Sequence, residues 1–102
     1  MFDSELYTIR WLGINKNQKS ISIWGWLVMR EGNRNYAFWG FIGTRVNFKL
    51  HHWSYKLEFL VNSAKERGYT DIEPQDYVKT YDEKFIENLE IDFMAATLGE
   101  IF

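Results

Sequence analysis

The chain has 102 residues, 46% of them apolar and 25% charged, with one Pro and no Cys. This composition is typical of one compact soluble domain, and the length excludes a large catalytic domain. The lack of Cys excludes disulfides, thiolate metal sites and thiol nucleophiles. The apolar runs are far shorter than the roughly 20 residues that span a bilayer, so we expect a cytoplasmic protein without a membrane segment.

The small formal net charge of −2 hides an uneven distribution. Residues 1–67 hold ten Lys and Arg against five acids, whereas residues 68–102 hold two Lys against nine acids. The local charges are therefore +5 and −7. This asymmetry indicates a polyanionic partner for the first part, a basic partner for the second, or packing of the two parts on each other.

Alternating apolar and polar residues predict strands through most of the first half of the chain. The four predicted strands are residues 6–14, 20–29, 36–41 and 45–50. Both faces of the second strand are largely apolar, which is typical of a central strand. In the fourth, Val46, Phe48 and Leu50 alternate with Arg45 and Lys49, which predicts a half-buried strand with a basic outer face.

The apolar spacing changes to three and four near residue 51. The new period predicts a helix to about residue 67, packed on the sheet and ended by Gly68. We expect a short helical turn at Pro74. A last, acidic helix is predicted from about Asp82 to Leu98, ending at Gly99. Four apolar residues of this helix form the face that we expect to dock on the rest of the chain: Phe85, Leu89, Phe93 and Ala96.

Together these elements predict a single α+β domain over residues 1–102. Residues 1–69 form the basic, aromatic part, an antiparallel sheet of about four strands with one packed helix. Residues 70–102 form an acidic helical extension.

No residues in the sequence form a credible active site, so we predict a non-catalytic protein without metal or cofactor. His51 and His52 are the only histidines, and neighbouring helical residues point about 100° apart, so the pair cannot chelate one ion. Glu83, Glu87 and Glu90 share a helix face, but a solvated acidic face explains them better than an acid and base pair.

Residues 36–69 carry a set of motifs in a fixed order. A Trp39-Gly40 step ends a strand, a Gly-containing turn and a short strand with Phe48-Lys49 follow, and an amphipathic helix closes on residues 65–69, Lys-Glu-Arg-Gly-Tyr. This order resembles the WGR domain, named for its Trp-Gly-Arg motif. The resemblance implies a mainly antiparallel sheet with a helix across it, and a role in binding nucleic acid or neighbouring domains. Phe41 stands where that family has its Arg, so one guanidinium for a phosphate or partner is missing.

The resemblance and the apolar pattern also predict a structural core, in which Trp39 is buried where strand meets helix. Its members are Trp39, Gly40, Trp53, Leu57, Gly68 and Tyr69.

Basic residues of the first part could form one patch for phosphates, with Trp and Tyr rings available for stacking. The candidates are Arg30, Arg34, Arg45, Lys49, Lys65 and Arg67. The same charges would also serve simply to keep an aromatic-rich domain in solution.

Two functional hypotheses follow from these patterns. The first is a small WGR-like module that binds nucleic acid. The alternative is a protein-interaction module, such as a small inhibitor or adaptor of a phage or mobile element. Such a module would present exposed aromatics, or Glu83, Glu87 and Glu90, to a basic protein surface.

Overall fold

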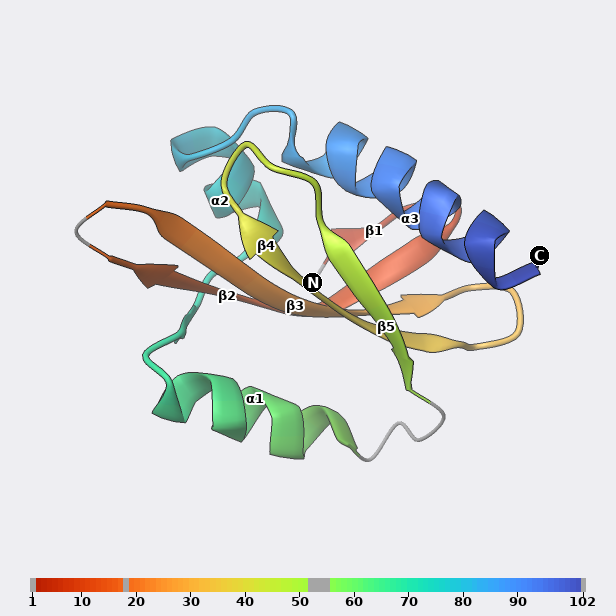
Figure 1. Cartoon of the computed structure of the whole chain (residues 1–102), viewed down its shortest axis with the longest axis horizontal. Helices are drawn as coiled ribbons and strands as arrows, with labels where there is room; N and C mark the ends of the chain where they lie inside the picture. Colours follow the sequence, from red (N-terminus) through yellow and green to blue (C-terminus); the bar gives the residue numbers. More distant parts are fainter. Residues whose placement is uncertain (1, 18, 52–55, 102) are drawn as a thin grey trace.

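The computed structural model describes residues 2–17, 19–51 and 56–101, and it confirms an α+β fold with an antiparallel sheet. In these residues the sheet has six strands rather than about four. They are β1 (Phe2–Asp3), β2 (Tyr7–Lys16), β3 (Ile21–Met29), β4 (Asn35–Phe41), β5 (Asn47–His51) and β6 (Thr70–Asp71). One helix, α1 (Lys56–Glu66), lies on one face of the sheet, and α2 (Pro74–Thr80) and α3 (Phe85–Ile101) lie on the other (Figure 1).

The sheet is a meander from β1 to β5, with β3 in the centre as expected. β6 pairs with β2 on the edge that β1 also uses, because β3 occupies the other edge. The two short strands take separate stretches of that edge: Phe2 pairs with Ile9, and Asp71 pairs with Gly13. The second part of the chain therefore returns to the sheet beside its first long strand.

A β-bulge at Arg10 decides which face each side chain of β2 takes. Ile9 pairs with Leu27, but Trp11 pairs with Trp26, so Arg10 is an extra residue in β2. Because of this insertion, Ile9 and Leu12 both face the α2–α3 layer, where both are buried in the core. Trp11 turns to the α1 side of the sheet.

The buried core lies between the sheet and the α2–α3 layer. Both parts of the chain contribute to it, which confirms that the acidic helix docks on the sheet through its apolar face. The fully enclosed cluster comprises Tyr7, Ile9, Leu12, Ile14, Ile23, Leu27, Tyr36, Phe38, Tyr77, Phe85, Leu89 and Phe93. Ala96, at the end of the predicted docking face, is half-buried.

The predicted structural core was wrong, because its described members lie outside this cluster. Trp39, Gly40, Leu57 and Tyr69 are half-buried and Gly68 is exposed, whereas Trp53 lies outside the described residues. The physical reason is that β3 is apolar on both faces, and the two helices of the α2–α3 layer cover their face more fully than α1 covers the other. The close backbone approach expected at Gly40 is confirmed, since a Cβ there would lie 3.2 Å from the Arg45 carbonyl oxygen.

The helix ends differ from the prediction in three places. His51 pairs with Asn35 as the last residue of β5, so it is not helical. α3 begins at Phe85, three residues after Asp82, whose carboxylate accepts a hydrogen bond from the Lys84 amide. It then continues through Gly99 to Ile101, because a lone Gly weakens a helix without ending it. Within the described ranges, no helix combines the length and apolarity that crossing a membrane requires.

Alkaline pH is expected to destabilise the fold through Tyr77. Burial, aided by the Asp82 carboxylate, raises the pKa of Tyr77 from 10.0 to about 12. The raised pKa contributes stability that is fully present below about pH 10 and lost as pH rises towards 12. Tyr77→Phe should therefore reduce the loss of stability in denaturant unfolding between about pH 10 and 11. An unchanged pH dependence would show that the phenol ionises as readily in the folded protein as in the unfolded chain.

Candidate binding surface on the α1 face

Trp24 and Trp39 form a stacked pair on the face of the sheet that α1 crosses. The two residues are directly opposite each other on β3 and β4, with ring centroids 5.2 Å apart and planes 19° apart. On the other side of Trp24 the β2 partner is Gly13. A side chain at Gly13 would collide with the Trp11 indole, which lies within 2.5 Å of the Cβ position, so glycine allows the Trp11 ring to lie flat over the strand.

The turn that ends α1 is fixed against this tryptophan pair. Gly68 adopts φ +99°, and the Tyr69 amide donates to the Ala64 carbonyl, which reverses the chain at the end of the helix. The Arg67 guanidinium lies over the Trp24 ring, 4.7 Å from its centroid. The Tyr69 ring meets the same indole edge-on, and its hydroxyl lies 3.1 Å from Ser22 Oγ. A cation is thus held on an indole face by the local structure of the turn.

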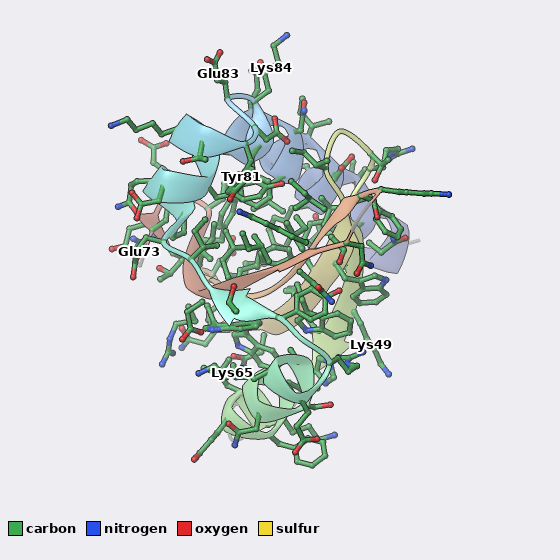
Figure 2. All side chains as sticks on the ribbon, turned by 90° about the vertical axis from the view of Figure 1, so that its left-hand side faces the viewer. Lys49, Lys65, Glu73, Tyr81, Glu83 and Lys84 are labelled. Carbon is green, nitrogen blue, oxygen red and sulfur yellow. The ribbon has the colours of Figure 1, made fainter. Side chains whose placement is uncertain are left out.

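An exposed aromatic and a second cation lie next to the pair. Phe41, two residues after Trp39 on the same face of β4, is 54% exposed. Lys49 is exposed on β5, two residues from Asn47, the residue that pairs with Trp39. Figure 2 shows the Lys49 side chain on the α1 side of the sheet. We define the aromatic–cationic surface as Trp24, Trp39, Phe41, Lys49 and Arg67.

The six predicted cations do not form one patch. Arg30 contacts Asp3 at 3.4 Å, and it lies with Arg34 in the β3–β4 turn. That turn lies at the end of the sheet where β2 begins. Arg67 lies at the opposite end, where its carbonyl accepts a hydrogen bond from Asn15, close to the last residue of β2. Of the six, Lys49 and Arg67 lie beside the Trp24–Trp39 pair.

Two further predicted cations are bound to acids of the second part of the chain. Arg45 precedes β5 rather than belonging to it, and its guanidinium lies 3.3 Å from Asp92 of α3, on the opposite side of the sheet. Lys65 lies 3.2 Å from Asp71 of β6. The hydrogen bond from the Trp11 indole, together with Lys65, holds the pKa of Asp71 below its usual value. Asp92 and Asp71 therefore each neutralise one of the predicted cations, Arg45 and Lys65.

The predicted acidic site lies in the opposite layer from the aromatic–cationic surface. Glu83 is exposed in the turn before α3, Glu87 is exposed in its first turn, and Glu90 is half-buried. Burial, together with the Glu90 charge, raises the pKa of Tyr7. Figure 2 places Glu83 at the far end of the molecule from α1. The three carboxylates therefore do not face Arg67 or Lys49.

A cleft of about 550 Å³ opens where β2 meets α1 and the β6–α2 segment. Its polar lining includes Arg10, Lys65, Asp71, Glu73 and Asp76. Trp11 and Lys65 already engage Asp71, so part of this polar lining is satisfied within the chain. Among the described residues, no group of three His, Cys, Asp or Glu residues is placed to hold a metal ion.

Sequence reasoning did not predict three members of the aromatic–cationic surface as binding residues: Trp24, Phe41 and Trp39, the last of which was expected in the structural core. Trp24 alternates with the core residues of β3, which indicates that it lies on the opposite face of the strand. Because both faces of that strand are apolar, this alternation did not identify Trp24 as a site residue. Phe41 was noted only as the residue that replaces an Arg. Protein-family models, curated proteins and solved structures were all compared with this chain, and none of them matches it.

Proposed function

We propose that this chain is a small, non-catalytic, WGR-like module that binds single-stranded nucleic acid through the aromatic–cationic surface. The observation that carries the proposal is the arrangement around Trp24, whose indole is stacked on Trp39 while the Arg67 guanidinium lies over its ring. Flat aromatic faces with cations beside them are what proteins use to stack bases and contact phosphates of a single strand.

The exposure of Phe41 supports a stacking mode, whereas Trp24 and Trp39 are half-buried. Phe41 is 54% exposed, so its ring is accessible to a base. Lys49 and Arg67 come from β5 and from the end of α1, so they can contact phosphates on either side of the tryptophan pair. The aromatic–cationic surface as defined contains two cations, Lys49 and Arg67, so the affinity should depend weakly on salt, with a log–log slope of about −1.4 for a single strand.

The proposal predicts that cations and aromatics affect binding in different ways. Lys49→Gln combined with Arg67→Gln should weaken binding of a dT-rich oligonucleotide about tenfold at low salt and bring the salt slope close to zero. Phe41→Ala should lower affinity by about 1 to 3 kcal/mol while leaving the slope unchanged, because no phosphate contact is lost. Fluorescence anisotropy at several salt concentrations measures both quantities.

A matched control removes the same charge elsewhere. Arg34 and Lys79 are exposed in the β3–β4 turn and on α2, so replacing both by Gln should leave oligonucleotide binding nearly unchanged. Arg45→Gln should also have little effect, because Arg45 is paired with Asp92. If the control pair weakens binding as much as the Lys49 and Arg67 pair, the attraction is a general effect of charge and the proposed surface is wrong.

A further inference from the structure

α3 has an apolar stripe on the side that faces away from the sheet. Ile91, Met94 and Leu98 are 58%, 51% and 54% exposed. Their spacing of three and four places them on one face of the helix, and the exposed Ala95 lies between them. We call Ile91, Met94 and Leu98 the α3 stripe.

The opposite side of the same helix is fully used by the fold. Phe85, Leu89 and Phe93 of α3 are enclosed in the core. The second half of α3 is therefore apolar on both sides, a pattern typical of helices that are covered on both sides. The described residues cover one side only, and a contiguous exposed apolar surface of this kind marks an interaction site.

The charges of α3 indicate what kind of surface could cover the stripe. The sequence of α3 contains four acids, Glu87, Glu90, Asp92 and Glu100, and no Lys or Arg. Its last turn has no basic residue to compensate the negative end of the helix dipole. Glu87 is exposed and lies one turn before Ile91 on the same side. A partner with basic groups beside its apolar residues would match this potential, whereas a second copy would place acid against acid.

A small notch adjoins the stripe on the side of the β4–β5 turn. Its volume is about 210 Å³, and its lining includes Gly43, Arg45, Asn88 and Ile91. Arg45 is bound to Asp92 there, so this flank of the stripe is closer to neutral than the flank with Glu87 and Glu90. The notch is large enough to accept one side chain of a helix packed along α3.

We propose that the α3 stripe docks an amphipathic helix of another protein, one with apolar residues at helical spacing and Lys or Arg on its flanks. Ile91, Met94 and Leu98 span about two helical turns, roughly 10 Å, so a partner helix of three turns covers them. This surface lies on the opposite layer from the aromatic–cationic surface, so the inference does not depend on nucleic-acid binding.

The test uses designed peptides as probes. One labelled 18-residue peptide has Leu at positions i, i+3, i+4 and i+7 and Lys elsewhere, a second has Glu in place of Lys, and a third is a scrambled form of the first. In fluorescence anisotropy at about 0.15 M salt, the Lys peptide should bind at least tenfold more tightly than the other two. Ile91→Gln combined with Leu98→Gln should weaken this binding at least tenfold, because it removes two of the three anchors.

Matched variants separate docking from general effects. Phe59 on α1 is 73% exposed and lies on the other side of the sheet, so Phe59→Gln removes a similar apolar group and should leave peptide binding unchanged. Glu87→Gln with Glu90→Gln should reduce the preference for the Lys peptide over the Glu peptide. Thermal unfolding followed by circular dichroism checks that each variant is folded, and Met94→Gln alone replaces the double variant if the latter unfolds.

Three results would overturn the proposal. The first is equal binding of the Lys, Glu and scrambled peptides, or binding that the stripe variants do not change. The second is a concentration-dependent dimer in sedimentation that Ile91→Gln and Leu98→Gln abolish, which would make a second copy the occupant. The third is stripe-dependent binding to vesicles of phosphatidylcholine and phosphatidylglycerol without a preference among the peptides, which would make a lipid surface the occupant.

Discussion

Replacing Phe93 with Ala is expected to lower the free energy of unfolding by about 3 to 5 kcal/mol. The Phe93 ring is the meeting point of three aromatic residues from three strands. Its centroid lies 5.5 Å from that of Tyr7, 5.1 Å from that of Tyr36 and 5.6 Å from that of Phe48. Removing the ring leaves a cavity between α3 and the sheet that rigid aromatic neighbours cannot fill. Urea unfolding followed by tryptophan fluorescence measures the loss.

Trp39→Ala provides the comparison for this prediction. The Trp39 ring is larger than that of Phe93, but it is half-buried and packs mainly on Trp24, so its loss should cost only about 1.5 kcal/mol. A larger loss for Trp39 than for Phe93 would mean that the α1 side of the sheet, rather than the α3 side, dominates stability.

Gly25→Ala is expected to destabilise the protein by about 3 kcal/mol, although it adds a single methyl group. A Cβ at Gly25 would lie 2.1 Å from Cζ of Phe38, whose ring covers the glycine on the core side of β3. Phe38 is fully buried and packs against Phe48 and Phe85, so its ring has no free space to enter. Chemical denaturation of the variant gives the size of the effect.

A second glycine offers a control of opposite sign. A Cβ at Gly99 of α3 would have no atom of the described residues within 4 Å, so Gly99→Ala should stabilise the protein by about 0.5 to 1 kcal/mol through helix propensity.

A second substitution tests the cause of the effect at Gly25. Adding Phe38→Leu to Gly25→Ala should recover part of the lost stability. If Gly25→Ala alone is tolerated within about 0.5 kcal/mol, the sheet can shift to admit the methyl group and the core is less tightly packed than we infer.

The longer elements were predictable because their patterns are local. Alternation over residues 20–29 and helical spacing after Pro74 each report on neighbouring residues only. By contrast, β1 and β6 have two residues each, and they are strands only because they pair with the free edge of β2. The bulge at Arg10 also leaves no local signal, yet it decides that Leu12 rather than Trp11 enters the core.

The location of the core and of the candidate site depended on packing that the sequence does not specify. Both faces of β3 are apolar, so periodicity could not tell which face of the sheet would hold the core, and Trp39, on the face that α1 crosses, was expected to be buried but is half-buried. The charge counts predicted one basic patch, but they could not predict that its members would lie in separate places. Arg45 meets Asp92 across 47 positions of sequence, and this pairing removes Arg45 from the surface that holds Lys49 and Arg67.

The arrangement of β1 and β6 on β2 bears on how the protein behaves at high concentration. Exposed strand edges are templates on which further chains can pair and aggregate. One edge of the long β2 is covered at two places, and the Ile72 amide adds a hydrogen bond to the Leu12 carbonyl between them. The other edge is β5, a strand of five residues with the exposed Lys49, which in the described residues pairs only with β4. A short edge with a lysine resists the addition of another strand, so the surfaces left open for partners are the faces of the molecule rather than the margins of its sheet.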